Sequence, residues 1–212
     1  MSRLNRGQRP NFAPALALGA FALVLGGVAT WTSLLLSWDT AGLRAIALRA
    51  GQSPGWLIES FQWITWAGDA AQRSIVMIGF ALVLLSKKRW RAALIMLIFP
   101  AVAGASSSIL KQLFARSRPD IVPHLDSFSN LSFPSGHATS ATAILILAAL
   151  IVPTRQRSLW LALAGGGAAL VASSRLLLGV HWPSDIVGGM AWGLGFALAG
   201  QAMARAWGDA PR

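Results

Sequence analysis

Long apolar stretches without charged residues dominate the chain. A helix needs about 20 mostly apolar residues to cross the roughly 30 Å hydrocarbon core of a bilayer. Only short segments separate most of these stretches, which favours one compact bundle and leaves no room for a soluble domain. The second stretch is short, and it accommodates Arg73 only if that side chain snorkels at the end of the helix. Six candidate spans are predicted: 13–36, 70–86, 92–110, about 135–153, 158–174 and 183–204.

The segment between the first two spans, residues 39–69, is predicted to form two short helices. Apolar residues recur at helical spacing around Leu43 and, after the break at 53–55, around Phe61. This pattern is typical of helices that lie in the membrane interface. The segment is either a simple connector or a lid or lateral gate over a lipid-binding site. We therefore expect an all-α integral membrane bundle of six transmembrane helices, with two short interfacial helices between spans one and two.

The composition agrees with a membrane protein and excludes several other classes. Hydrophobic residues make up 55% of the 212 residues and charged residues only 12%, against about 25% charged residues in an average soluble domain. The net charge of +11 would suggest nucleic-acid binding in a soluble protein. Because the mean hydropathy is +0.57, we attribute the basic excess to membrane topology and expect no nucleic-acid partner. The absence of cysteine excludes disulfides, thiolate metal sites and cysteine nucleophiles.

The distribution of basic residues predicts the orientation in the membrane. Of the 18 Lys and Arg residues, eleven fall on the side of the two termini and seven on the other side. Cytoplasmic loops carry an excess of Lys and Arg, so both termini are predicted to be cytoplasmic. A basic start followed by an apolar stretch also occurs in cleaved secretory signals, but this stretch is longer than the roughly 7–15 residues of the apolar region of a signal peptide.

A histidine and an aspartate flank the start of the last predicted span, on the outer side. Ionisable groups at such positions are costly and indicate a function. Pro183 suits the first position of a helix, so His181 precedes that helix and Asp185 lies in its first turn. The carboxylate can then hold one ring nitrogen and leave the other free as a nucleophile or base.

Other polar residues on the outer side predict an anion site. The turn at residues 134–136 leads into a helix, whose N-terminus favours a bound anion. Lys111, Arg118 and Arg175 lie at nearby helix ends or loops. Phosphate fits such a set of cations, because the guanidinium fork matches its oxygen atoms.

Each of these features has a simpler interpretation when taken alone. His181 and Asp185 would form a helix-capping pair, His137 would bind a backbone carbonyl, and Lys111 and Arg175 would snorkel. Their clustering on one predicted face argues against these interpretations. Four polar residues outside this set are expected to be solvated loop residues: Arg116, Asp120, His124 and Asp126. The glycines at 165–167 and 188–189 are expected to be close-packing positions between helices.

Three sequence segments carry these residues: Lys111-x6-Arg118-Pro119, Pro134-Ser135-Gly136-His137 and Ser174-Arg175-x5-His181-x3-Asp185. They are similar to the three-part signature of the type-2 phosphatidic-acid phosphatase family, complete and in order. The resemblance covers residues 111–185 closely, and the six-span layout extends it to most of the chain. It implies a single membrane-embedded phosphatase domain over residues 1–212, with signature segments 111–119, 134–137 and 174–185.

The resemblance implies a role for each matched residue. His181 would attack phosphorus to give a phosphohistidine, Asp185 would orient it, and His137 would protonate the leaving oxygen and then activate water. No cofactor and no metal is implied, and Asp185 alone among the seven acids in the chain lies in the cluster, too few carboxylates for a two-metal site. The remaining residues would bind the phosphoryl oxygens: Lys111, Arg118, Ser135, Gly136 and Arg175.

The implied substrate is the terminal phosphate of a lipid phosphate or pyrophosphate, of the undecaprenyl pyrophosphate, phosphatidylglycerol phosphate, phosphatidic acid or lipid A type. The expected location is a bacterial cytoplasmic membrane, with the site facing the periplasm or exterior. Vanadate-dependent haloperoxidases have a similar site but are soluble, so the six spans argue against that class. The non-enzymatic alternative is a transporter or binding protein that uses the same cationic pocket, although transporters place such charges near the midplane on broken helices.

Overall fold

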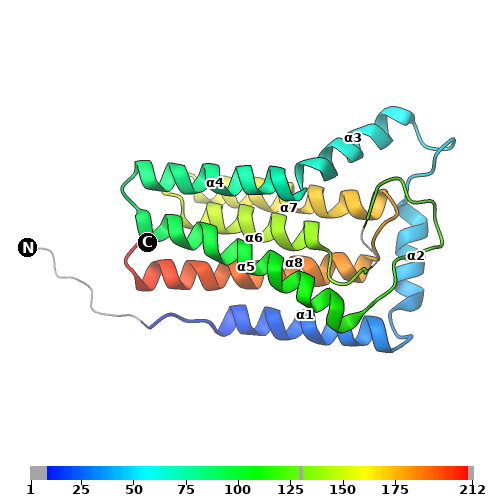
Figure 1. Ribbon diagram of the computed structural model, residues 1–212, viewed down its shortest axis with the longest axis horizontal. Coiled ribbons are helices and arrows are strands. Elements are labelled where there is room, and N and C mark those ends of the chain that lie inside the picture. The colour runs from blue at the N-terminus through cyan, green and yellow to red at the C-terminus, as the bar shows by residue number, and fades with distance from the viewer. Residues whose placement is uncertain (1–8, 129–130, 210–212) are drawn as a thin grey trace, which may run out of the picture.

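The computed structural model describes residues 9–128 and 131–209. Within these residues the chain forms helices and a single isolated bridge between Ser117 and Leu131. Most of the helices run side by side along the long axis, while α2 crosses one end and α3 leaves the bundle at an angle (Figure 1). The helices are α1 (Ala13–Trp31), α2 (Leu36–Ile46), α3 (Gly55–Ala67), α4 (Ala70–Ser86), α5 (Trp90–Phe114), α6 (Gly136–Ile151), α7 (Arg157–Leu177) and α8 (Pro183–Ala206).

Helix α6 lies at the centre of the bundle, packed against α5, α7 and α8. Small residues on α8 allow the backbones of α6 and α8 to approach closely: a Cβ atom on Gly189 would lie 2.7 Å from the carbonyl oxygen of Ser135. The close packing predicted for residues 188–189 is therefore confirmed. The same prediction is wrong for Gly165 and Gly166, whose added Cβ atoms would meet nothing within 4 Å.

The all-α membrane architecture agrees with the prediction. Among the described residues, α1, α5, α7 and α8 are each long and apolar enough to cross a membrane. Helices α3 and α4 form a pair bent by 55° that passes the same test together, and α6 is apolar but has 16 residues. The start of α1 and the end of α8 lie at the same end of the bundle (Figure 1).

The first predicted span is wrong at its end, because α1 stops at Trp31 and Leu36 already belongs to α2. The hydroxyl of Thr32 donates to the carbonyl oxygen of Val28 and accepts from the N–H of Leu34. Such local bonds compete with the helix and end it. The residues of this turn carry no charge, so the absence of charged residues does not distinguish the turn from the helix before it.

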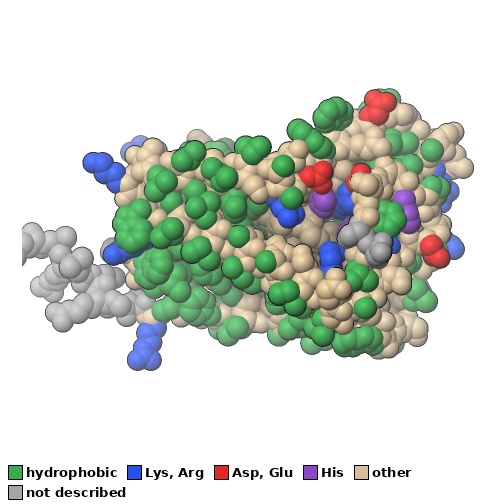
Figure 2. Space-filling view, in the orientation of Figure 1, with side chains coloured by type: hydrophobic (Ala, Val, Ile, Leu, Met, Phe, Trp, Pro, Cys, Tyr) green, Lys and Arg blue, Asp and Glu red, His purple; other side chains and the backbone are tan. Residues whose placement is uncertain are grey.

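Large apolar side chains cover the outside of the long helices (Figure 2). Leu16 on α1 is 70% exposed, and Ile75 on α4 and Ile109 on α5 are each 69% exposed. Exposed apolar surface of this extent marks a surface that contacts lipid or another apolar partner. The bundle therefore presents an apolar outside and, as described next, a polar cavity near one end.

Candidate active site

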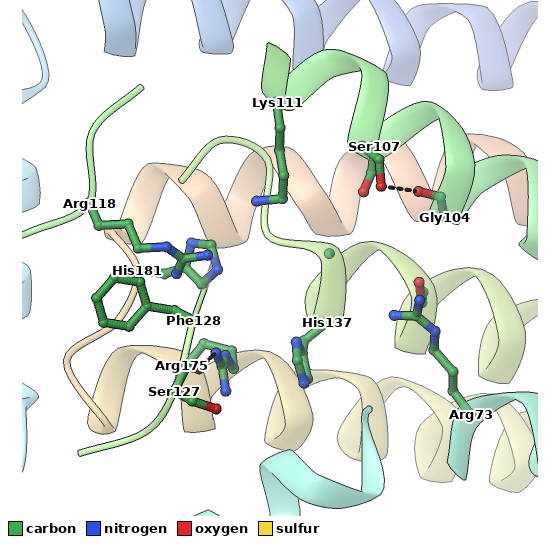
Figure 3. Close-up of a pocket in the computed structure, with 13 residues that line it drawn as sticks. Arg73, Gly104, Ser107, Lys111, Arg118, Ser127, Phe128, His137, Arg175 and His181 are labelled. Atoms are coloured by element: carbon green, nitrogen blue, oxygen red, sulfur yellow. Dashed lines mark hydrogen bonds between the residues drawn. The ribbon is translucent and has the colours of Figure 1, made fainter. Parts of the chain in front are cut away.

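The three signature segments meet at a cavity of about 400 Å³. Figure 2 shows it as a hollow with Lys, Arg and His side chains around it, on the part of the bundle nearer to α2. Its wall contains six of the eight predicted site residues: Lys111, Arg118, Gly136, His137, Arg175 and His181 (Figure 3). Residues outside the prediction complete it: Arg73, Gly104, Ser107, Ser108, Ser127, Phe128 and Ser140.

His181 is held by a buried carboxylate. Its Nδ1 lies 3.1 Å from Oδ2 of Asp185, which also accepts from the backbone N–H of Trp182 at 2.9 Å and from the hydroxyl of Ser132. With Nδ1–H donated to the carboxylate, the lone pair of Nε2 is available for chemistry. Burial lowers the pKa of His181 well below its usual range, against the opposing effect of Asp185, so the ring is neutral at pH 7.

Arg116 holds the other oxygen of this carboxylate, and its predicted place in a solvated loop is wrong. The side chain is 8% exposed, and its two terminal nitrogens donate at 2.6 Å to Asp185 and at 2.6 Å to Asp39 of α2. Asp39 is fully buried and also accepts from the N–H of Ser184 at 2.9 Å. One sequence signal existed: Asp39 lies four residues before Leu43 and so shares its apolar face, where a carboxylate requires a buried partner.

Lys111 and Arg118 are oriented by backbone carbonyl groups. Lys111 Nζ donates to the carbonyl oxygens of residues 131 and 132, each at 3.0 Å, and Arg118 donates to that of Val180 at 2.5 Å. Burial, together with the charge of Arg175, lowers the pKa of Arg118 to about 10. Arg118 is therefore still charged at neutral pH.

Arg175 is buried at the end of α7 and is only partly satisfied by the protein. It donates to the hydroxyl of Thr65 at 2.6 Å and pairs with Asp126, so the predicted solvated position of Asp126 is wrong. The buried Nε has no hydrogen-bond partner among the described residues. A buried donor without a partner needs explanation, and a phosphoryl oxygen in the cavity would supply the acceptor.

The turn from α7 to α8 brings Arg175 and His181 to the same cavity. Gly179 has a φ of 76°, and a Cβ atom there would lie 2.7 Å from the carbonyl oxygen of Pro123. Only glycine combines this left-handed conformation with such a close approach. The spacing between Arg175 and His181 in the signature thus has a local structural cause.

His137, in the first turn of α6, contacts the bend between α3 and α4. Its Nε2 lies 3.0 Å from Oδ1 of Asp69, which is 52% exposed, and a Cβ atom on Gly68 would lie 2.8 Å from the ring. Thr65 on α3 also contacts Arg175. Segment 39–69 therefore contributes directly to the site and is more than a connector.

The remaining predicted residues stabilise helix ends or lie at the surface. The hydroxyl of Ser135 accepts from the N–H of Ala138 at 3.5 Å as the N-cap of α6, and it does not line the cavity, whereas Gly136 does. The N–H of Ser135 donates to the backbone carbonyl of Asp185 at 3.1 Å, which fixes the start of α6 against α8. Asp120 and His124 are exposed as predicted.

Comparisons with known proteins identify the relatives of this chain. The family model of the PAP2 superfamily matches residues 90–208. Phosphatidylglycerophosphatase B of Bacillus subtilis is 33% identical over 187 residues, which cover 84% of this chain and 89% of that protein. The decaprenylphosphoryl-5-phosphoribose phosphatase of Mycobacterium tuberculosis is 43% identical over 95 residues, which cover 43% of this chain and 50% of that protein.

Solved structures give the same result at the level of the fold. The crystal structure of a transmembrane PAP2 type phosphatidylglycerolphosphate phosphatase from Bacillus subtilis superposes with a TM-score of 0.80 and 28% identity, covering 91% of this chain and 96% of that chain. The crystal structure of Aquifex aeolicus LpxE gives 0.59 at 21% identity over 77% of this chain and 94% of that chain, a likeness of fold alone. The chain therefore belongs to the PAP2 superfamily, the type-2 phosphatidic-acid phosphatase family that its signature resembles, and it is a phosphatase.

Proposed function

We propose that this protein is an integral-membrane lipid phosphatase that removes the terminal phosphate of a lipid phosphate or pyrophosphate through a phosphohistidine, without a metal ion. One observation carries the proposal: His181, whose ring is held by Asp185, and His137 both line a single cavity whose wall also contains Lys111, Arg118 and Arg175. Two relatives named above are phosphatases of lipid-linked phosphates by name, the phosphatidylglycerophosphatase B and the decaprenylphosphoryl-5-phosphoribose phosphatase.

The first step transfers the phosphoryl group to His181. Its Nε2 attacks phosphorus while the bond from phosphorus to the lipid oxygen breaks, and the electron pair of that bond stays on the lipid oxygen. His137 supplies the proton that this oxygen takes up. Asp185 stabilises the positive charge that develops on the ring of His181.

The second step returns the enzyme to its starting state. His137, now neutral, accepts a proton from a water molecule whose oxygen attacks phosphorus. The bond from phosphorus to Nε2 of His181 breaks, its electron pair returns to Nε2, and inorganic phosphate leaves. In both steps charge spreads over the phosphoryl oxygens, and preorganised donors stabilise it. The residues that supply these donors are Lys111, Arg118 and Arg175, with the N–H of Gly136.

The proposed topology has six spans, α1 and α4 to α8, with α2 and α3 near the outer interface. The excess of Lys and Arg on the side of the termini supports cytoplasmic termini, and the cavity then faces the periplasm or exterior of a bacterial cytoplasmic membrane. The chain has no cysteine, so single cysteines at Lys88 and Pro123 label without background. We expect a membrane-impermeant reagent to label Pro123→Cys and not Lys88→Cys in intact cells; the reverse result contradicts the orientation.

Phosphate release by purified protein tests the chemistry. We expect release from phosphatidic acid or a polyprenyl pyrophosphate in detergent, insensitivity to EDTA and inhibition by vanadate. The variant His181→Ala is expected to be inactive, whereas His124→Ala, which removes a histidine outside the cavity, keeps activity within about threefold, the scale of a surface change below about 0.5 kcal/mol. Activity in the His181→Ala protein, or a strict metal requirement, contradicts the mechanism. Phosphate binding without release from any lipid favours the transporter or binding-protein alternative.

A further inference from the structure

Arg73 is a fourth cation in the cavity wall, and it lies outside the three signature segments. It comes from the first turn of α4 and sits beyond His137 as seen from His181 (Figure 3). A charged side chain in an apolar span is costly, and the helix dipole disfavours a cation in the first turn. The stability of α4 therefore does not explain an arginine at this position.

The predicted snorkelling of Arg73 does not account for it either, because its side chain lines the cavity. The other three cations are each held by a backbone carbonyl or a carboxylate. Among the described residues, no carboxylate oxygen lies within 4.0 Å of the Arg73 guanidinium. Asp69, one helical turn before it, bonds His137 instead. The geometry thus leaves the Arg73 guanidinium available to a ligand.

A second cavity of about 140 Å³ continues from Arg73 between α4, α5 and α6. The two cavities share Arg73, Gly104 and Ser140. The second one is lined mainly by apolar residues such as Met77 and Ile144. If the reacting phosphorus of a substrate lies at His181 and its apolar part lies in this second cavity, the atoms that connect the two lie next to Arg73. Those atoms belong to the leaving group, since His137, the proposed acid, lies on the same side.

We propose that Arg73 binds a second phosphate on the leaving side of the substrate, so that the enzyme selects lipids carrying two phosphates over lipids carrying one. The inference rests on the proposed function, and it assigns the substrate class within it. The larger cavity has room for more than one phosphate: at ~30 Å³ for each water-sized group, its volume holds about a dozen heavy atoms. The guanidinium fork matches the oxygens of a phosphate.

The chemistry of a lipid diphosphate gives Arg73 a role in the reaction itself. When His181 attacks the terminal phosphorus, the bond to the bridging oxygen breaks and its electron pair stays on that oxygen. Negative charge thereby develops on the second phosphate in the transition state, before the proton from His137 neutralises the bridging oxygen. Arg73 stabilises this group more in the transition state than in the bound substrate, which raises kcat. Some lipids carry the second phosphate as a diester farther from the reacting phosphorus. The charge of that diester does not change during the reaction, so Arg73 binds substrate and transition state equally and lowers KM instead.

Paired substrates with the same chain test this inference. We expect the wild type to hydrolyse polyprenyl diphosphate with a higher kcat/KM than polyprenyl monophosphate. The variant Arg73→Gln is expected to lose about 10- to 100-fold in kcat/KM on the diphosphate, the range for a charged hydrogen bond, mostly in kcat. Its loss on the monophosphate stays below about threefold, because that leaving group offers no second anion. Arg73→Lys keeps the charge and retains part of the preference.

The matched control is Arg44→Gln, which removes an exposed charge from α2, outside the residues that line the cavity, and leaves the preference unchanged. An equal loss on both substrates, or no loss on either, overturns the role of Arg73.

A second measurement needs no turnover and compares the binding of methylenebisphosphonate with that of inorganic phosphate. Arg73→Gln should weaken binding of the bisphosphonate and leave that of phosphate unchanged; equal effects on both overturn the inference. A wild type that binds the bisphosphonate through Arg73 but releases phosphate from no lipid contradicts only the proposed function.

Discussion

The two histidines of the cavity are held in opposite ways. His181 is 2% exposed and its partner Asp185 is fully buried, and Arg116 ties that carboxylate to a second buried one, Asp39. The imidazole of His137 is 17% exposed, and its partner Asp69 is 52% exposed. One histidine is thus part of the folded core, whereas the other is held by a solvent-exposed contact.

This difference matches what the proposed mechanism requires of each ring. His181 forms and breaks a bond to phosphorus, and a displacement of about 1 Å of a reacting group can lower a rate about 100-fold. His137 serves two different oxygen atoms, first of the leaving lipid and then of water. An exposed pair of this kind contributes only about 0–1 kcal/mol, so the His137–Asp69 contact adjusts at little cost in stability.

The largest effect is expected when the buried network around His181 is disrupted, because this removes the difference between the two histidines. Arg116→Ala leaves two buried carboxylates without their cation, and removal of one partner from such a network costs about 3–5 kcal/mol. We expect a lower melting temperature in detergent and a loss of activity of roughly 10³- to 10⁴-fold, as when the group that orients a catalytic histidine is disturbed. Thermal unfolding and kcat measure the two effects. A melting temperature and an activity near those of the wild type would show that the network does not position His181.

The next largest loss of activity is expected when His137, the proposed acid, is replaced, and its size depends on the leaving group of the substrate. His137→Asn removes the proton donor, which contributes about 10²- to 10⁴-fold for a poor leaving group. The first step on p-nitrophenyl phosphate should lose less, because p-nitrophenolate leaves without protonation. The second step still lacks its base, so p-nitrophenol should appear in a burst followed by slow turnover in a rapid-quench experiment. Equal losses for good and poor leaving groups in the first step would contradict the role of His137 as acid.

A smaller effect is expected from the exposed partner of His137. Asp69→Asn removes a pair worth up to about 1 kcal/mol, so we expect about a fivefold loss of kcat on a lipid monophosphate. The melting temperature should change little, in contrast to Arg116→Ala. Asp69→Glu should restore part of the rate, and Glu59→Gln on the exposed face of α3 is the matched control. The same loss for p-nitrophenyl phosphate as for the lipid would indicate a structural role instead of positioning of the acid.

The comparison also explains which parts of the site could be predicted from the sequence. The signature residues lie at helix ends, where spacing such as that of His181 and Asp185 determines local geometry, and the structure places six of the eight around one cavity. Arg116 and Asp69 were not predicted because their partners are distant in the chain: Arg116 binds a residue 77 positions away, and Asp69 one 68 positions away. Such contacts depend on how the helices pack, which a single sequence does not specify.

The fold follows the same rule. The order of apolar segments predicted a helical membrane bundle, because hydrophobic length is a local property. The ends of the segments depended on side-chain bonds such as that of Thr32 to the backbone, and these shortened α1. The place of Arg73 depended on packing as well: a charge near the start of a span predicts snorkelling, but the position of α4 against α5 and α6 directs this side chain into the cavity.

The smallest expected effect is in the pH dependence, and it tests the burial of His181 directly. Burial lowers the pKa of His181 well below its usual range, so the ring loses its proton at a lower pH than an exposed histidine and Nε2 remains a nucleophile in mild acid. For p-nitrophenyl phosphate, kcat/KM corrected for the titration of the substrate should change less than about twofold between pH 7.5 and 6. An exposed histidine with a pKa of about 6.5 would instead lose roughly three quarters of its neutral form at pH 6. A decline of that size would show that the nucleophile is solvated, and the two histidines would then not differ in the way that the structure indicates.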